Sequence, residues 1–351
     1  MTRLSLTRFL PLSLMLALCL PGLAPAADSK AHEQYLQAAK LFEQDRYDEA
    51  IAAVQKSIQL RPKFAEAHLL LGKVYFEGKR RASDAISAIK QAIQLKPDFP
   101  EAYYHLGLVY QTQGKFRDAE QALRQAIKLV PKYEEAYWAL GRQFQRNRRN
   151  ELAVEIFQTL LTVNPNHTGA LFSLAMVYDA QGETQKARET VERLTKADPT
   201  HPDGWYLLGR IEEKESHVPQ AIDAYRMAVS AKPDLVDAHF NLAFLYRSEG
   251  KMPEAVKRFE EVIRLRPEYA EAHLNLGGLY ANMGKLDPAE EEYETAVQLK
   301  PNLAEAHYSL GLFYESHRRD MGKALASYRK YIELGGRDER IDRIVGQAGG
   351  K

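Results

Sequence analysis

The chain has 351 residues, of which 45% are hydrophobic and 27% are charged, a composition typical of a soluble folded protein rather than a disordered one. Its 48 basic residues nearly balance its 47 acidic ones, and the net charge of +1 argues against nucleic acid as the main partner. A single cysteine excludes disulfide frameworks, iron–sulfur clusters and thiolate zinc sites, while a mean hydropathy of -0.44 excludes a polytopic membrane protein.

Residues 1–27 are predicted to be a secretory signal peptide. Arg3 and Arg8 precede an apolar run over residues 9–20, and Ala24-Pro25-Ala26 provides a small-residue cleavage site. The run is too short to cross a membrane, which takes about 20 apolar residues. We therefore expect an exported protein that is periplasmic or secreted.

The alternative is a membrane-anchored lipoprotein tethered through Cys19. The segment that ends at Cys19 resembles a lipid-attachment motif, but Leu18 stands where that motif has a small residue, and Cys19 lies inside the apolar run. This alternative is the only one in which we expect contact with a membrane.

The remainder of the chain is predicted to be a solenoid of repeated units, because a proline recurs at a nearly fixed interval. The first interval is 35 residues and each later one is 34, and a fixed period in this range indicates stacked repeats. The prolines are Pro62, Pro97, Pro131, Pro165, Pro199, Pro233, Pro267 and Pro301.

Each repeat is predicted to be two antiparallel helices. In one copy, four residues spaced i, i+3, i+4 and i+7 form an apolar helical stripe, which runs over Tyr103, Leu106, Gly107 and Tyr110. Gly114-Lys115 then breaks the chain, and a second stripe from Ala119 leads to the proline. A glycine or alanine at the i+4 position of the first stripe lets the helices approach closely, and the proline ends the second helix.

This pattern resembles the tetratricopeptide repeat family over about residues 31–336. Its Leu-Gly or Leu-Ala pairs are Leu71-Gly72, Leu106-Gly107, Leu140-Gly141, Leu174-Ala175, Leu208-Gly209, Leu242-Ala243, Leu276-Gly277 and Leu310-Gly311. The resemblance implies an all-α, right-handed superhelical α-solenoid over residues 28–336, followed by a short capping helix in 337–351. The expected repeats are 31–64, 65–99, 100–133, 134–167, 168–201, 202–235, 236–269, 270–303 and 304–336.

No enzyme motif is found, and we expect no catalytic residue, cofactor or metal. Gly114-Lys115 and two similar pairs lack the Ser/Thr and the upstream glycine of a phosphate loop, so we interpret them as interhelix turns. His239, His273 and His307 lie one repeat apart, on successive helices, and are interpreted as packed core residues because ligands of one zinc must converge. Some glycosyltransferases carry similar repeats, but their catalytic half is missing here.

A face of the first helix in each repeat is the expected binding surface. The resemblance implies that this face lines a concave groove that holds protein partners. The residue that follows the first stripe position is apolar or aromatic in every copy, although an exposed helix face is normally polar. These residues are Tyr35, Leu69, Tyr104, Trp138, Phe172, Tyr206, Phe240, Leu274 and Tyr308. Packing against the neighbouring repeat is the alternative explanation for each of them.

Polar groups are expected beside these rings. Arg142, Arg146, Arg210 and Arg247 are predicted to project into the groove, countered by Asp179 and Glu213. Asn241 and Asn275 resemble the start of an asparagine ladder, which in related solenoids bonds a peptide backbone. Acidic residues at 66, 101, 135, 203, 237, 271 and 305 begin the first helices and are interpreted as serving the helix dipoles.

These features predict a non-catalytic, exported scaffold that binds partner polypeptides in its groove. One alternative is an accessory factor of envelope export, pilus or polysaccharide assembly. Another is the substrate-recruiting subunit of a separate enzyme such as a glycosyltransferase. We also expect a soft joint between about residues 165 and 204, because Leu160 and Leu194 replace small residues and Gly169 and Gly204 weaken two helix starts.

Overall fold

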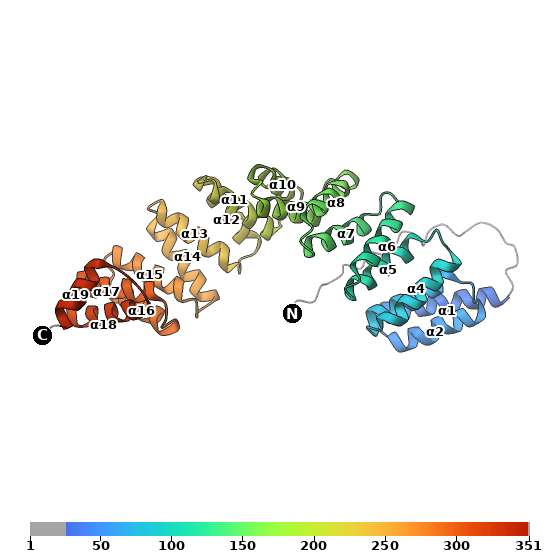
Figure 1. Ribbon diagram of the computed structural model, residues 1–351, viewed down its shortest axis with the longest axis horizontal. Helices are drawn as coiled ribbons and strands as arrows, with labels where there is room; N and C mark the ends of the chain where they lie inside the picture. Colours follow the sequence, from blue (N-terminus) through green and yellow to red (C-terminus); the bar gives the residue numbers. More distant parts are fainter. Residues whose placement is uncertain (1–25, 350–351) are drawn as a thin grey trace. The chain divides into compact units, whose positions relative to one another are not determined.

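The computed structural model describes residues 26–349 and forms two compact units, one up to Gln143 and one from Phe144 onward (Figure 1). All regular secondary structure between residues 26 and 349 is helical. The predicted signal sequence up to residue 25 and Cys19 lie outside the described residues, so signal peptide and lipid tether stay predictions.

The first unit consists of helix pairs in chain order. The first helices of its pairs are α1 (Ala26–Glu43), α3 (Ala65–Lys73), α5 (Pro100–Thr112) and most of α7 (Glu134–Arg146). The second helices are α2 (Tyr47–Leu60), α4 (Ala82–Leu95) and α6 (Phe116–Leu129). Consecutive helices from α1 to α6 contact one another, so α2 and α4 each pack against their partner and against the first helix of the next pair.

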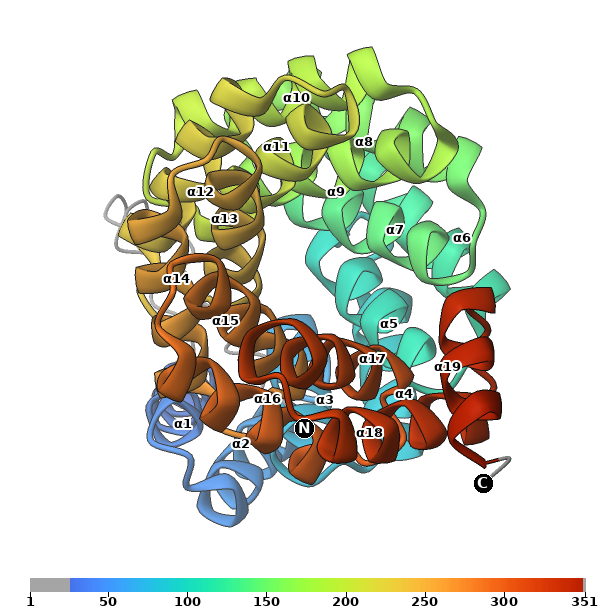
Figure 2. The same ribbon diagram turned by 90° about the vertical axis from the view of Figure 1, so that its left-hand side faces the viewer.

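The second unit repeats the same arrangement. Its first helices are α9 (Thr168–Gln181), α11 (Pro202–Lys214), α13 (Val236–Ser248), α15 (Ala270–Asn282) and α17 (Ala304–Phe313). Its second helices are α8 (Asn150–Val163), α10 (Thr184–Ala197), α12 (Val218–Ala231), α14 (Met252–Leu265), α16 (Leu286–Leu299) and α18 (Met321–Glu333). Figure 2 shows the odd-numbered helices α9 to α17 in one layer and their even-numbered partners in another. The predicted all-α solenoid of helix pairs is confirmed.

The two helices of a pair approach most closely at the small residue in the i+4 position of the first stripe. A Cβ placed on Gly72 would lie 2.5 Å from Cγ1 of Ile89, and one on Gly209 would lie 2.6 Å from the ring of Tyr225. Distances below 3.0 Å require the neighbouring side chain to move. The small residue of the repeat pattern therefore makes room for a large side chain from the second helix of the same pair.

The turn inside each pair contains one residue with left-handed backbone conformation. Glycine occupies this position at Gly114, Gly182, Gly250 and Gly284, which confirms that the Gly-Lys pairs are turns. Five other residues adopt the same conformation, at Asp45, Arg80, Arg148, Ser216 and Arg319. This backbone conformation favours glycine, so the sequence at these five positions does not indicate the turn.

In the second and ninth repeats, the segment from the start of the first helix to the start of the second is one residue longer than in the third repeat. This extra residue lies in a helix rather than in a loop. A π-helical turn, η2 (Val74–Gly78), continues α3, and a second, η3 (Tyr314–Arg318), continues α17. A π turn absorbs one added residue because its hydrogen bonds span five residues instead of four. The insertion is therefore taken up before the chain reaches the second helix.

The first stripe position carries a polar ring for a structural reason. Nε2 of His239 donates to the carbonyl oxygen of Pro233 at 2.9 Å, and His273 makes the same bond to Pro267. The corresponding ring nitrogen of Trp205 donates to the carbonyl of Pro199 at 2.8 Å. The same pairing, six residues apart, recurs at His68, Tyr137 and His307. The polar ring thus satisfies the carbonyl group of the proline that ends the preceding repeat.

His239 and His273 are buried, as expected for packed core residues, but the second nitrogen of each ring has a different partner. Nδ1 of His273 lies 2.6 Å from the Glu292 carboxylate, so both nitrogens face acceptors and the protonated ring satisfies them. Nδ1 of His239 lies 3.4 Å from Nη1 of Arg258, a donor, and suits a neutral ring. Arg258 and Glu292 occupy equivalent positions one repeat apart.

The short helix α19 (Glu339–Gly349) covers the end of the last repeat, next to α18 in Figure 2. Ile341 is fully buried in a cluster that includes Tyr314 and Tyr328. Nη1 of Arg340 donates to Oε1 of Glu315 at 2.8 Å and anchors the helix to the ninth repeat. This confirms the expected capping helix.

One of the two residue pairs that suggested a soft joint is well packed in the structure. Leu194 is fully buried, and a Cβ on Gly204 would lie 2.8 Å from its Cδ2, so the large side chain fills the space that the glycine leaves. Nδ1 of His201 accepts a hydrogen bond from the amide of Gly204 at 3.0 Å and caps α11. Leu194 and Gly204 are therefore matched in the packing, and the flexibility of residues 165–204 stays a prediction.

This complementarity predicts non-additive effects of mutation. Leu194→Ala should destabilise the protein by about 2–5 kcal/mol because it leaves a cavity. Gly204→Ala should cost about 1–3 kcal/mol in the native background, although alanine normally favours helices, because its methyl group overpacks the site. In the Leu194→Ala background, Gly204→Ala should instead stabilise the protein. Denaturant unfolding of the four proteins of this cycle tests the coupling, and strictly additive free energies would contradict it.

The two histidines predict opposite titration behaviour. Burial lowers the pKa of His239, and Arg258 adds to this effect. Burial also acts to lower the pKa of His273, but the hydrogen bonds to Glu292 and the Pro267 carbonyl outweigh it and raise that pKa. The contribution of His273 to stability is therefore present below about pH 6.5 and is lost as the pH rises through its folded pKa. That of His239 is present above about pH 6.5 and is lost as the pH falls through its folded pKa.

Proton NMR titration of the two rings, assigned with single His→Gln variants, measures both pKa values. Glu292→Gln should lower the pKa of His273 because it removes the charged acceptor. Glu291→Gln is the matched control, since Glu291 is exposed on the same helix. The account is wrong if the His239 ring titrates at the higher pH of the two.

Candidate functional site

The rings that follow the first stripe position in the first unit are held at the edge of the core. Tyr35, Tyr104 and Trp138 are each partly buried, whereas Leu69 is only 3% exposed. The Tyr35 ring packs at 5.1 Å from Phe64, and the Tyr104 ring at 5.3 Å from Tyr133, measured between centroids. The rings of Tyr35 and Tyr104 therefore use part of their surface for packing against the residue that leads into the next repeat.

The second unit shows the same arrangement. The Phe172 ring lies 5.3 Å from the ring of His201, and Phe240 stacks on Tyr269 at 5.0 Å with an interplanar angle of 16°. Tyr206 packs against Tyr225 of the second helix at 5.7 Å. All three first-helix rings remain partly exposed, as do Leu274 and Tyr308. We call the nine residues from Tyr35 to Tyr308 the ring stripe, described separately in each unit.

The covering residues are the part of this arrangement that the sequence analysis missed. Phe64, Tyr133, His201 and Tyr269 each stand two residues after a repeat proline and just before the next first helix. The signal was present in the sequence, because an apolar or aromatic residue follows every repeat proline at this distance. Packing and exposure are therefore both properties of the stripe, not alternatives.

Acidic residues surround the stripe tyrosines of the first unit. Burial, together with the negative charges of Glu101 and Glu66, raises the pKa of Tyr35. Burial, with Glu135 and Glu77, raises the pKa of Tyr104 to about 12. These phenols stay neutral at physiological pH and present apolar faces with a hydroxyl group at one edge.

The four predicted arginines are all exposed, and three of them have partners within the described residues. The guanidinium carbon of Arg142 lies 5.3 Å from the ring centroid of Trp138, which is a cation–π contact. Arg210 pairs with Asp179 at 3.5 Å, and Nη1 of Arg247 donates to Oδ1 of Asn275 at 2.7 Å.

The two asparagines are engaged in hydrogen bonds within the protein. Nδ2 of Asn241 donates to the hydroxyl oxygen of Tyr225 at 3.0 Å, and that hydroxyl donates to Glu213 at 2.7 Å. Nδ2 of Asn275 donates to the carbonyl oxygen of Glu271 at 2.7 Å. A peptide backbone would have to replace these bonds, so the asparagine ladder stays a prediction.

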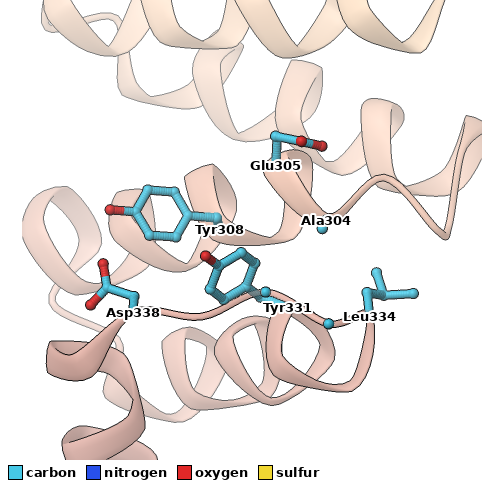
Figure 3. Close-up of a pocket in the computed structure, with 8 residues that line it drawn as sticks. Ala304, Glu305, Tyr308, Tyr331, Leu334 and Asp338 are labelled. Carbon is cyan, nitrogen blue, oxygen red and sulfur yellow. The ribbon is translucent and has the colours of Figure 1, made fainter.

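A pocket of about 400 Å³ lies at the C-terminal end of the second unit (Figure 3). The rings of Tyr308, from α17, and Tyr331, from α18, lie 5.1 Å apart and form one wall. The carboxylates of Glu305 and Asp338 also line it, and Asp338 lies near the hydroxyl end of Tyr308 in Figure 3. Gly335 and Gly336 complete the rim. The sequence analysis identified Tyr308 but not this pocket.

Two other kinds of site were searched for in the described part of the chain. Residues 26–349 contain no group of three or more His, Cys, Asp or Glu side chains arranged to hold a metal ion. No helix among these residues has both the length and the apolar character needed to cross a membrane.

Comparison with known proteins was made on sequence and on structure. Tetratricopeptide repeat family models match residues 38–78, 82–114, 100–133, 146–211, 245–284 and 279–317. A search of curated proteins found no match. The family-model matches follow the helix pairs in both units.

Solved structures of tetratricopeptide proteins are similar to the chain. The C-terminal part of a TPR repeat-containing protein from Cytophaga hutchinsonii is 16% identical, with a TM-score of 0.60 over 68% of this chain and 97% of that one. The protein pilF of Pseudomonas aeruginosa is 17% identical, with a TM-score of 0.51 over 60% and 95%. YrrB, described as a TPR protein with an unusual peptide-binding site, is 22% identical, with a TM-score of 0.45 over 53% and 95%. At these identities the similarity shows the fold alone. With its helix pairs and the family matches along both units, the chain belongs to the tetratricopeptide repeat family, whose members serve as protein-interaction scaffolds.

Proposed function

We propose that this protein is a non-catalytic scaffold that holds an extended or helical segment of a partner protein against its ring stripe. The observation that carries this proposal is that the aromatic rings of the stripe are all partly exposed, at the same position of successive repeats. Exposed apolar side chains that recur at one position of a repeat form a surface, and such surfaces usually mark an interface.

The way in which the rings are held supports binding. Each covered ring is fixed on one face by its neighbour, as Phe240 is by Tyr269, so a partner would order few additional side chains. Rigid aromatic side chains give contact area at a low cost in conformational entropy. The stripe is therefore preorganised for a partner that packs on the exposed edges of the rings.

The polar groups near the stripe limit where the partner gains most. Arg210 is paired with Asp179, and Arg247 is paired with Asn275, so both guanidinium groups would exchange one partner for another. Arg142 instead lies over the ring of Trp138. Tryptophan and arginine are the residues most enriched among binding hot spots, so we place the strongest anchor at Trp138.

We also propose that the protein acts outside the cytoplasm. The support is the sequence of residues 1–27, which lies almost wholly outside the described residues, and the near absence of cysteine.

The export proposal predicts the start of the mature chain. Protein isolated from native cells should begin at Ala27 or Asp28 and should be found outside the cytoplasm. N-terminal sequencing by mass spectrometry measures this directly. Recovery of the chain with Met1 intact would contradict export, and a lipid on an N-terminal Cys19 would support the lipoprotein alternative instead.

The binding proposal predicts the effect of Trp138→Ala on a partner captured from the envelope fraction. A central hot-spot truncation typically costs about 2 kcal/mol or more, which corresponds to a loss of affinity of roughly thirtyfold. Because Trp138 is only partly buried and Tyr137 fills the neighbouring core slot, the melting temperature should fall less than when a fully buried residue of the same helix is truncated. Calorimetry and affinity measurements on the same protein give both values.

Trp138→Phe is the matched control, since it keeps an aromatic ring and should lose less affinity. Leu140→Ala removes a fully buried side chain of the same helix and should lower stability instead. A large loss of melting temperature in Trp138→Ala, with unchanged affinity per folded molecule, would show that the stripe serves packing alone.

A further inference from the structure

The pocket at the C-terminal end is best understood by comparison with the second repeat, which has an insertion of the same length. In the second repeat, Leu69 of the ring stripe packs in one cluster with Phe99, the residue two after the proline. The equivalent of Phe99 in the ninth repeat is Asp338, because the same interval of 30 residues separates it from Tyr308. At this position the ninth repeat therefore has a carboxylate in place of a ring, and Tyr308 packs instead against Tyr331 of its own repeat, at 5.1 Å between ring centroids.

A cation is missing at the same place. In the second repeat, Nζ of Lys96 donates to Oε1 of Glu66 at 3.2 Å and lies 4.7 Å from the ring centroid of Phe99. The eighth repeat has the same pair, in which Nζ of Lys300 donates to Glu271 at 2.6 Å. The equivalent of Lys96 in the ninth repeat is Gly335, which has no side chain to offer.

Glu305 is the ninth-repeat equivalent of Glu66 and Glu271. It is exposed in the first turn of α17, and it makes no hydrogen bond or ion pair with any residue between 26 and 349. Lys300 interacts with it electrostatically but makes its short contact with Glu271 instead. Glu305 thus lacks the lysine partner that Glu66 and Glu271 have.

Asp338 adds a second carboxylate to the same pocket. Its Oδ1 accepts hydrogen bonds from the amides of Arg340 and Ile341 at the start of α19. Its Oδ2 makes no hydrogen bond within the described residues. The pocket therefore combines a pair of partly exposed tyrosine rings, two carboxylates and two glycines that leave its rim open.

We propose that this pocket binds the side chain of an arginine from the partner polypeptide. A guanidinium group is planar and stacks on aromatic rings, so it suits the partly exposed rings of Tyr308 and Tyr331. It is also a permanent cation with several donors, so it can pair with the free oxygen of Asp338, while the exposed carboxylate of Glu305 in the same lining favours its positive charge.

This inference rests on the proposed function, because it assigns the chemistry of the partner at the last residue of the ring stripe. It adds that the bound segment carries an arginine that reaches α17 and α18. A neutral or acidic segment would leave both carboxylates desolvated without a partner, which is unfavourable.

The test uses a short blocked peptide, acetyl-Gly-Arg-Gly-amide, and the same peptide with citrulline in place of arginine. Citrulline has nearly the same shape but carries no charge. NMR spectra of the full mature chain with labelled tyrosines, assigned with Tyr308→Phe and Tyr331→Phe, report on the pocket directly. We expect the arginine peptide to shift the Tyr308 and Tyr331 resonances and to bind about tenfold more tightly than the citrulline peptide.

Glu305→Gln should weaken binding of the arginine peptide by about fivefold, as the carboxylate is exposed and partly screened. Glu271→Gln is the matched control one repeat earlier, where Lys300 already occupies the carboxylate, and it should leave the affinity unchanged. Asp338→Asn keeps an oxygen to cap α19 and should also weaken binding.

Equal affinity for the arginine and citrulline peptides, or full affinity in Glu305→Gln, would overturn the proposal. So would shifts confined to tyrosines outside the pocket. These outcomes are independent of Trp138→Ala, because that experiment measures the whole partner. If Trp138→Ala loses affinity but the pocket does not bind arginine, only the present inference fails, and the reverse result would reject only the stripe.

Discussion

The contact between a first-helix ring and the residue that leads into the next repeat is the interaction on which this structure depends. Phe240 on Tyr269 and Tyr104 on Tyr133 show its geometry. The contact joins one repeat to the next, and in a solenoid such nearest-neighbour interfaces supply much of the stability. It also fixes the ring whose remaining surface faces outward.

The same contact links stability to recognition. A ring that must pack on one face cannot be replaced by a polar residue, so every repeat except the second, where Leu69 is buried, keeps a partly exposed apolar side chain at this position. The proposed function uses this surface rather than a separate site. At Tyr308 the residue that leads out of the repeat is Asp338 instead of a ring, and a pocket remains. Binding at the last repeat therefore follows from the same geometry as packing in the earlier ones.

Much of the fold could be predicted from the sequence because the small residue at i+4 recurs in every copy and the repeat proline in every copy but the last. The polar ring of the first slot was placed in the core correctly, as with His239 and His273, but its bond to the proline carbonyl was not foreseen. That bond spans a turn, and only the folded geometry brings the two groups together. Local spacing therefore identified the helix pairs but not the contacts across their ends.

The expectations that the structure does not support, and those that stay open, depend on contacts with residues outside the local sequence pattern. Leu194 suggested a loose joint only because the space left by Gly204 was considered separately. Asn241 and Asn275 suggested free amides, although Tyr225 and Arg247 bind them in the folded protein. The pocket beside Tyr308 required knowledge of which residue covers each ring, and periodicity in one helix does not give that information. Contacts between residues about 30 positions apart, such as Tyr104 with Tyr133, determine which surfaces of the rings are exposed.

The central claim is that the partner lies on the ring stripe rather than on the outer face of the second helices. Hydroxyl-radical footprinting of the mature protein with and without its captured partner tests this claim most directly. The claim predicts that oxidation of Tyr104, Trp138 and Phe240 falls in the complex. Oxidation of Phe116 and Met227, which are 40% and 41% exposed on second helices, should not change. Protection of Phe116 and Met227 with unchanged oxidation of the stripe would contradict the account.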